Sequence, residues 1–384
     1  MASSNALVPS SDLRKEIFSR GGETATRCYQ CATCTSVCEL STVDNTFPRR
    51  QMLCVQWGLG ERLAADPAVW LCHQCNDCTV RCPRDAKPGD VMQIARGLAI
   101  EELAFPRFVG KLVGNARTTW ALLLAVPFAF WLTMVWLHNG LTAPSGPEWA
   151  YGDAVPHWLI YAVFFPALLG FAGVPALVGA SRAWKKWGEG AERKGSLVRA
   201  VTGTVTEIIS HKRFGSCGTA VGRKWGHFLL FWGFVLAATT SGFLVVWLYG
   251  YHLELPGFSA RCESGIADCH LPLGNWMKIM GNLGAVSLVL GGLLILFHRL
   301  RADKPAGKTT AFDNLLLTVV LLVIGTGVGA EVLRLMDDGR LGLWVYIVHL
   351  SAVLCLFLSI PYSKFAHMIY RTLAMVHERM VATR

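Results

Sequence analysis

Charged side chains are scarce in this chain of 384 residues. Asp, Glu, Lys and Arg make up 16% of it, whereas a soluble domain carries about 25%. Hydrophobic residues make up 53%, which excludes both a disordered chain and an ordinary cytosolic enzyme. The first 27 residues are polar and lack an apolar core of signal-peptide length, so no secretory signal is expected.

The net charge of +10 does not indicate a nucleic-acid partner. Residues 1–110 carry twelve basic and twelve acidic side chains, so this polar segment is balanced. The excess lies between hydrophobic segments, where Lys and Arg report the orientation of a membrane protein. Binding to nucleic acid is therefore not expected.

The composition divides the chain into a polar, cysteine-rich domain at 1–110 and an apolar domain at 111–384. A helix of about 20 apolar residues crosses the hydrocarbon core of a bilayer. Six stretches are long enough for this, near 118–138, 156–180, 225–250, 273–298, 312–335 and 342–363. Trp and Tyr mark many of their ends, as is typical of membrane–water interfaces.

The basic residues predict the orientation of these six spans. The loops 181–224 and 299–311 and the tail 362–384 hold eighteen Lys and Arg, whereas the opposite loops hold two. By the positive-inside rule, the cysteine-rich domain and both termini lie in the cytoplasm. The segment 196–210 of the longest inner loop is predicted to be a solvated helical connector, with an interfacial amphipathic helix or a docking surface as alternatives.

Nine of the thirteen cysteines lie between Cys28 and Cys82, and eight of them form two runs of identical spacing. Each run is C-x2-C-x2-C-x3-C, and the runs are Cys28, Cys31, Cys34 and Cys38, then Cys72, Cys75, Cys78 and Cys82. Three thiolates of such a run hold one [4Fe–4S] cluster and the fourth completes its neighbour. The spacing therefore predicts one cluster on Cys28, Cys31, Cys34 and Cys82, and another on Cys38, Cys72, Cys75 and Cys78.

Two other uses of these cysteines fit less well. Structural zinc prefers two separated C-x2-C pairs, and disulfides are disfavoured in a reducing cytoplasm. Cys54 lies outside both runs and is expected to be a buried structural thiol. Two neighbouring clusters point to one-electron transfer, and the fold class predicted is all-α: a helical two-cluster ferredoxin-like domain followed by six spans.

Histidines near the membrane are candidate haem ligands, because ionisable groups there are costly. His349 and His367 are 18 residues apart, which on one continuous helix is five turns, on one face and about 27 Å apart along the axis. His227 begins the third span at the level of His367, so these two are predicted to ligate a b-type haem. His298 is interpreted equally well as an interfacial cation.

Three smaller features lie towards the outer side. Lys278 is either a snorkelling lysine or a hydrogen-bond donor to a quinone carbonyl. Glu331 and Arg334 are spaced to pair on one helix face or to take up protons from a quinol. Cys262 and Cys269 are expected to form a disulfide.

The glycines at 325–329 match a dinucleotide fingerprint without its βαβ context, so they are interpreted as helix-packing glycines.

Together these motifs resemble known families. Residues 1–110 resemble the C subunit of heterodisulfide reductases, including Gly21-Gly22-Glu23 before the first run and Trp70-Leu71-Cys72 at the second. The apolar part resembles the haem b subunit of respiratory nitrate reductases. The fusion in this order resembles the C subunits of quinone-interacting membrane-bound oxidoreductase (Qmo) complexes of sulfate-reducing bacteria.

The resemblance implies electron exchange between menaquinone and two cytoplasmic flavin and iron–sulfur subunits, with adenylylsulfate reductase as the end acceptor. It implies that His227 and His367 hold an inner haem, that His349 helps to hold an outer one, and that Lys278 lies at the quinol site. The second outer ligand of the relatives is replaced here by Ala237, so the haem count is one or two, with His252 and His270 as candidate ligands.

The function expected is membrane electron transfer from quinol through haem b and two [4Fe–4S] clusters. The protein does not complete a reaction alone, so no catalytic residue is assigned. The alternatives are a membrane subunit of heterodisulfide reductase type, for which dedicated site cysteines are not evident, and a metal-bearing membrane anchor without quinone chemistry.

Overall fold

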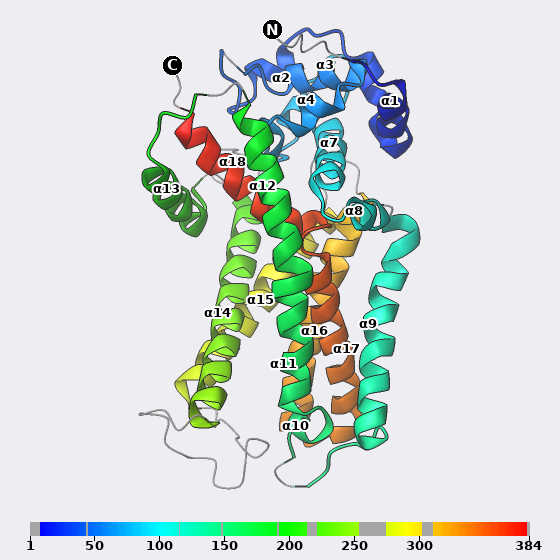
Figure 1. Cartoon of the computed structure of the whole chain (residues 1–384), viewed down its shortest axis with the longest axis vertical. Coiled ribbons are helices and arrows are strands. Elements are labelled where there is room, and N and C mark those ends of the chain that lie inside the picture. The colour runs from blue at the N-terminus through cyan, green and yellow to red at the C-terminus, as the bar shows by residue number, and fades with distance from the viewer. Residues whose placement is uncertain are drawn as a thin grey trace.

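The computed structural model describes residues 8–43, 45–114, 116–146, 149–189, 192–212, 221–252, 274–301 and 310–381. Within those ranges every regular element is a helix and no strand occurs. The predicted all-α class is therefore confirmed. Figure 1 shows a lobe of short N-terminal helices above a bundle of long ones.

The N-terminal lobe consists of short helices around one apolar core. They are α1 (Ser11–Ile17), η1 (Phe18–Gly22), η2 (Glu23–Arg27), α2 (Thr33–Ser36), α3 (Arg49–Trp57), α4 (Gly60–Ala64), α5 (Ala68–Leu71), α6 (Asp77–Val80) and α7 (Pro88–Leu103). Met52, Val55 and Met92 are fully buried in this core, and Cys54 is 6% exposed beside them. The interpretation of Cys54 as a buried thiol is confirmed.

Six helices of membrane-spanning length form the bundle. They are α9 (Ala116–Asn139), the continuous rod of α11 (His157–Phe165), η3 (Pro166–Gly173) and α12 (Val174–Gly188), then α14 (Val221–His252), α15 (Trp276–Arg301), α16 (Ala311–Leu335) and α17 (Gly339–Ser359). Large apolar side chains such as Leu122, Val126 and Leu290 stay exposed along them. Water disfavours an apolar surface of that extent, whereas lipid does not.

The rod formed by α11, η3 and α12 is the second span. It continues to Gly188, beyond the predicted end of that span at residue 180. Arg182, Lys185 and Lys186 follow the apolar stretch without breaking the helix, because charged residues with good helix propensity end a membrane span without ending helical structure. The rod thus reaches past the bundle towards the N-terminal lobe (Figure 1).

The prediction that His349 and His367 share one helix is wrong. α17 ends at Ser359, a turn and the 3-10 helix η6 (Lys364–Ala366) follow, and His367 begins a new helix, α18 (His367–Met380). Pro361 cannot donate a backbone hydrogen bond, and Ser363 caps η6 by accepting from the Phe365 amide. α18 runs obliquely across the lobe-facing end of the bundle (Figure 1).

Glycines bring α14 and α15 into backbone contact. A Cβ added at Gly291 would lie 2.8 Å from both the Gly226 carbonyl oxygen and the Leu230 nitrogen. The same close approach recurs seven residues earlier in α15, where a Cβ added at Gly284 would lie 3.2 Å from the Gly233 carbonyl oxygen. Small residues at such a seam are typical of helix packing in membranes.

The lobe and the bundle meet through aromatic side chains. Trp70 of α5 stacks at 4.6 Å on Tyr370 of α18, and Trp187 of α12 donates to the Ala64 carbonyl at 3.2 Å. α8 (Arg107–Gly114) leads from the lobe into α9, α10 (Tyr151–Ala154) lies at the far end, and α13 (Leu197–Ser210) packs beside α18. The second cysteine run, which starts after α5, is therefore held against α18.

Candidate metal centres

Both cysteine runs fold in the same way locally. Gln30 and Ala32 in the first run have φ of 60° and 68°, and Gln74 and Asn76 at the matching positions of the second have 52° and 63°. Left-handed conformations cost a non-glycine residue about 1–2 kcal/mol each. Two such residues at equivalent positions curl each run, so that successive cysteine side chains face a common space.

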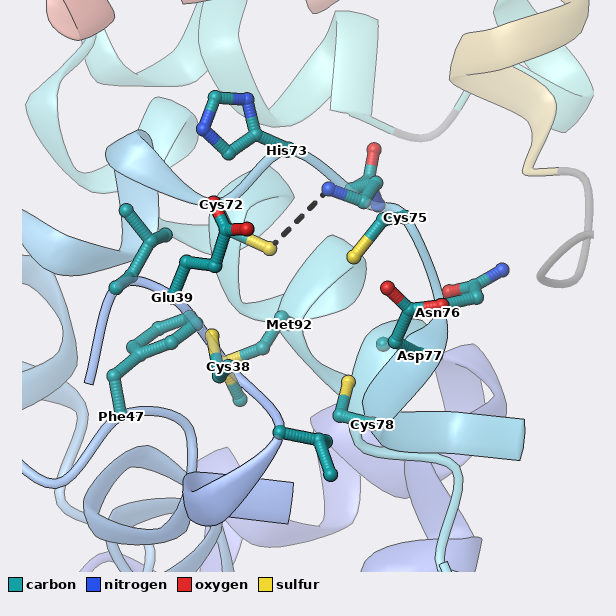
Figure 2. Close-up of a pocket in the computed structure, with 14 residues that line it drawn as sticks. Cys38, Glu39, Phe47, Cys72, His73, Cys75, Asn76, Asp77, Cys78 and Met92 are labelled. Atoms are coloured by element: carbon teal, nitrogen blue, oxygen red, sulfur yellow. Dashed lines mark hydrogen bonds between the residues drawn. The ribbon is translucent and has the colours of Figure 1, made fainter. Parts of the chain in front are cut away.

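The second run lines a cavity of about 140 Å³ together with the last cysteine of the first run. Figure 2 shows the sulfur atoms of Cys38, Cys72, Cys75 and Cys78 directed into this space. Phe47 and Met92 form part of the wall. Sequence-distant thiols are thus brought together by the packing of the Cys38 turn against the loop before α6.

The thiols of this group are buried or half-buried and interact with one another electrostatically. Burial raises the pKa of Cys38 to about 11, with smaller contributions from the negative charges of Cys72 and Cys75. Burial also raises the pKa of Cys78, and its thiol neighbours are again Cys72, Cys75 and Cys38. Four neighbouring thiolates that are partly shielded from water repel one another, and the positive charge of a bound metal cluster would compensate for this.

The fourth cysteine of the second run lies with the first run. Burial raises the pKa of Cys34, and its nearest charged neighbours are Cys28, Cys82 and Cys31. The structure thus places Cys38, Cys72, Cys75 and Cys78 around one cavity, and the grouping of Cys28, Cys31, Cys34 and Cys82 stays a prediction. Cys31 is the one exposed cysteine of the eight, and each predicted group has one buried member, Cys34 and Cys72.

Nitrogen donors surround the sulfur atoms. The Gln74 amide donates to Cys72 Sγ at 3.5 Å, shown by the dashed line in Figure 2, and the Ala86 amide donates to Cys82 Sγ at 3.4 Å. In the first run, Gln30 Nε2 donates to Cys28 Sγ at 3.6 Å. Hydrogen bonds of this type set the reduction potentials of iron–sulfur clusters.

The four thiols of the second group line a cavity and do not converge on one point. In the part of the chain that the structure describes, no three His, Cys, Asp or Glu side chains converge closely enough to hold one metal ion. Thiolates around zinc lie about 2.3 Å from one point. The four thiols here instead line a cavity, which is the arrangement that a cubane cluster needs.

Two arginines hold the start of the second run, one from the N-terminal lobe and one from α18. Arg96 of α7 is buried and donates to the carbonyl oxygens of Val69 and Cys72 at 2.9 and 2.8 Å. Arg371 of α18 donates to the same Cys72 carbonyl at 3.5 Å and to Nδ1 of His73 at 2.9 Å. Arginine has no acceptor, so His73 accepts at Nδ1.

His367 lies one turn of α18 away from Arg371. Its Nδ1 donates to the Lys364 carbonyl at 2.5 Å, which leaves Nε2 as the unprotonated nitrogen. The pKa of His367 is lowered to about 3, chiefly by burial and to a smaller extent by the positive charges of His227, Arg96 and Arg371, while the hydrogen bond to the Lys364 carbonyl opposes the shift. A neutral imidazole with Nδ1 hydrogen-bonded to a backbone carbonyl is the usual form of a metal-ligating histidine.

His227 of α14 has a partner that the sequence did not indicate. Its Nδ1 lies 3.1 Å from Nε2 of His211, which is 4% exposed and lies between the rings of Phe228 and Phe231. His211 follows α13 with a left-handed φ of 50°. No spacing pattern links His211 to His227, so the sequence alone indicates no role for it.

His349 lies on the opposite part of the bundle, against α16. Its Nδ1 is 3.1 Å from Thr326 Oγ1, and a Cβ on Gly327 would come within 2.9 Å of its ring. Gly327 thus serves helix packing, as expected for 325–329. Ala237 packs into the apolar cluster with Leu288, and the His252 side chain, His270, Cys262 and Cys269 lie outside the described residues.

Lys278 of α15 pairs with Glu331 of α16. The Nζ–Oε1 distance is 2.5 Å, and the two side chains are 25% and 31% exposed. Tyr151 of α10 donates to the neighbouring Ala330 carbonyl at 2.7 Å. Lys278 is therefore held by an acidic partner, and this pair occupies the end of the bundle remote from the N-terminal lobe.

Comparison with known proteins agrees with this site. A family model described as a 4Fe-4S dicluster domain matches residues 24–86. The C subunit of the H(2):CoB-CoM heterodisulfide,ferredoxin reductase of Methanothermobacter thermautotrophicus is 34% identical over 88 residues, which are 23% of this chain and 48% of that protein. A protein of Archaeoglobus profundus described as similar to the C subunit of heterodisulfide reductase is 38% identical over 85 residues, 22% of this chain and 45% of the relative.

One relative extends into the bundle. Citrate utilization protein B of Escherichia coli is 24% identical over 320 residues, which are 78% of each chain. No solved structure matches the chain. The chain spans about half the length of the two heterodisulfide reductase relatives. It therefore carries an iron–sulfur dicluster domain related to their C subunits, followed by six helices of membrane-spanning length.

Proposed function

We propose that this chain is the membrane electron-transfer subunit of an oxidoreductase complex, carrying electrons between menaquinol and a cytoplasmic partner. The observation that carries the proposal is the continuity between two candidate sites. Arg371 donates to the Cys72 carbonyl and to His73, and one turn away on the same helix His367 lies near His227. A cluster held by the second run and a haem held by these histidines would be neighbours.

The cysteines are assigned to two [4Fe–4S] clusters, which supply one-electron carriers. One is held by Cys28, Cys31, Cys34 and Cys82, and the other by Cys38, Cys72, Cys75 and Cys78. The second group lies against α18, and the first includes the exposed Cys31. Electrons leave the chain, on this proposal, through the first group.

A b-type haem between His227 and His367 supplies the carrier at the membrane. Both imidazoles have Nδ1 engaged, by His211 and by the Lys364 carbonyl, so each presents Nε2. The chain orients both rings through these contacts. We propose one haem here, and a second, outer haem would need another ligand, because Ala237 stands where the nitrate reductase subunits that the sequence resembles have theirs. His349 stays a predicted ligand of an outer haem.

The quinol site is proposed at the Lys278–Glu331 pair. The ammonium group is placed to donate to a quinone carbonyl, and the carboxylate is placed to accept a proton from a quinol hydroxyl. The pair lies between two spans, where an ionisable residue is a functional candidate. Two-electron quinol chemistry would then occur at one end of the bundle and one-electron transfer at the other.

The orientation proposed follows the basic loops. The bilayer is the bacterial inner membrane, and both termini lie in the cytoplasm. The partners proposed are membrane lipid, two cytoplasmic subunits carrying flavin and iron–sulfur centres, and adenylylsulfate reductase as the end acceptor. A membrane protein of heterodisulfide reductase type and a non-catalytic anchor are the alternatives.

The match to citrate utilization protein B favours a second candidate. The match spans 78% of this chain and therefore includes much of the bundle, which favours a role of the same electron carriers in citrate utilization instead of sulfate respiration. Oxidation of the reduced complex by adenylylsulfate reductase distinguishes the two. Rapid reoxidation supports sulfate respiration, and no reoxidation favours the citrate-linked role.

The experiment that tests the proposal is a cofactor analysis of the detergent-solubilised full chain, purified without oxygen. We expect about eight iron atoms in clusters with matching acid-labile sulfide, and haem b in a ratio of about one per chain. Zinc in place of iron, or iron without haem, would contradict the proposal. A ratio of two haems per chain would show that an outer haem is bound and that a second residue ligates it together with His349.

A further inference from the structure

α13 presents three different faces. At 100° per residue, Ala200, Thr204 and Glu207 lie on one side, which is turned towards α18. A second side is exposed and apolar, and consists of Val198, Val201, Val205 and Ile209, which are 71%, 40%, 44% and 44% exposed. The third side is exposed and polar, and consists of Arg199, Thr206 and Ser210.

The first face fixes α13 to the protein. Ala200 is 3% exposed and Thr204 fully buried. Arg379 of α18 donates to Thr204 Oγ1 at 3.1 Å and forms an ion pair with Glu207. The helix is therefore held in one rotational setting, and the direction of its two exposed faces is determined by the fold.

The C-terminal end of α13 lies level with the start of a membrane span. His211 is the residue after α13, and its ring centroid lies 5.3 and 5.2 Å from those of Phe228 and Phe231. The apolar part of α14 begins at Lys224, so these rings belong to its first two turns. Figure 1 shows α13 beside the lobe-facing end of α14.

The two exposed faces match the two sides of an interface. A solvated connector would expose polar residues on both, whereas four branched apolar side chains here form one continuous stripe. Arg199 and Lys212 are exposed beside the stripe, where they suit anionic headgroups. Helices that lie in the plane of the membrane surface typically have one apolar and one polar face. They lie level with the ends of the membrane spans, as the end of α13 does here.

We propose that α13 is an interfacial helix whose valine stripe inserts into the cytoplasmic leaflet of the lipid bilayer. This rests on the membrane location in the proposed function and not on its redox chemistry. The inserted helix anchors α18 and His211 at a fixed height, since both contact α13 or its end. The segment predicted as a solvated connector is then a membrane-binding element.

The test uses p-benzoylphenylalanine, a photo-crosslinking amino acid, in the full chain reconstituted into nanodiscs with phosphatidylethanolamine and phosphatidylglycerol. It replaces Val198 or Val205 on the stripe, and Thr206 or Ser210 on the polar face as matched controls. After illumination, mass spectrometry of the intact chain measures lipid adducts. We expect several-fold more adduct from the stripe positions than from the polar ones.

Leu290 serves as the reference position, because it is an exposed apolar residue of the α15 span. Lipid adducts at Leu290 without adducts at Val198 and Val205 overturn the inference while the membrane location stands. No adduct at Leu290 contradicts the membrane location itself. Adducts of Val198 with a second copy of the chain or with another protein also overturn the inference.

Discussion

At the scale of single residues, the exchange of Cys38 and Cys82 between the two runs carries the strongest prediction. Each lies with the three leading cysteines of the other run. We expect Cys82→Ala to remove the same iron–sulfur signal as Cys31→Ala, and Cys38→Ala the same signal as Cys75→Ala. Electron paramagnetic resonance of the reduced protein makes this comparison.

Each of these four variants should lose about half of the iron. Cys54→Ala provides the control, since this buried thiol lies in the same lobe outside both groups. If Cys82→Ala and Cys75→Ala removed the same signal instead, each run would hold its own cluster, and the crossed assignment would be wrong.

His211 is predicted to position the His227 imidazole. When His227 ligates through Nε2, its Nδ1–H donates to His211, which makes the ring more basic and favours ferric iron. His211→Phe keeps the aromatic packing on Phe228 and Phe231 but removes the acceptor. We expect haem affinity to fall about tenfold or more and the haem midpoint potential to rise.

A redox titration followed in the visible spectrum measures that potential. His298→Phe is the matched control, because His298 is exposed on α15 and should leave the potential unchanged. An unchanged potential in His211→Phe would show that this contact is structural only.

Residue spacing predicted the cysteine groups because both runs close local loops. The pairing of His211 with His227 could not be predicted in the same way. The two rings are brought together by the packing of α13 on α18 and α14, and nothing in the intervening sequence records that packing. The acidic partner of Lys278 was likewise missed, because Glu331 was expected to interact with Arg334 on its own helix.

At the scale of helices, the contact between α14 and α15 depends on the absence of side chains. Gly291→Ala would place a methyl group 2.8 Å from two backbone atoms of α14. We expect this variant to lose about 1–3 kcal/mol of stability, because the backbones must separate. Thermal unfolding in detergent, followed by circular dichroism, measures the loss.

Gly325→Ala on α16 is the matched control. No atom lies within 4 Å of its added Cβ, and alanine favours a helix over glycine by about 1 kcal/mol. The midpoint temperature of its thermal unfolding should equal that of the unsubstituted protein or exceed it. Equal destabilisation by both substitutions would mean that tight packing at Gly291 is not the cause.

Helix existence was predictable from long apolar stretches, whereas helix ends were not. The apolar pattern runs on to 363, but the helix stops at Ser359, since Pro361 and the Ser363 cap favour a turn. Apolarity reports where lipid surrounds the chain, and helix ends follow backbone hydrogen bonding. The expected five-turn separation of His349 and His367 failed for that reason.

At the scale of the whole molecule, Arg371 links the lobe to the bundle. Arg371→Gln removes a charged donor to His73 and to the Cys72 carbonyl, and it leaves every proposed ligand in place. We expect unchanged cofactor content and several-fold slower electron exchange between haem and clusters. Stopped-flow absorbance of the reduced protein mixed with an oxidant measures that rate.

Arg379→Gln is the control on the same helix, because Arg379 contacts α13 and not the lobe. Equal slowing by both substitutions would indicate a general disturbance of α18. The conservative variant Arg371→Lys should recover part of the rate, since one donor and the charge remain.

The N-terminal lobe and the helix bundle were predictable from their different compositions, but the contact between them was not. Trp70, Trp187 and Tyr370 come from segments far apart in the chain, and each alone resembles an ordinary buried aromatic residue. Their contact brings the second cysteine run close to His367. The proposed electron path therefore depends on tertiary packing that spacing does not encode.

The most direct test of the central claim is an anaerobic optical spectrum of the purified chain before and after addition of a reduced menaquinone analogue. Electron transfer from quinol to the clusters predicts growth of a sharp α-band of b-type haem together with bleaching of the broad iron–sulfur absorption. Haem that stays oxidised in the presence of the quinol, or a spectrum without haem, would contradict the claim and favour a membrane anchor.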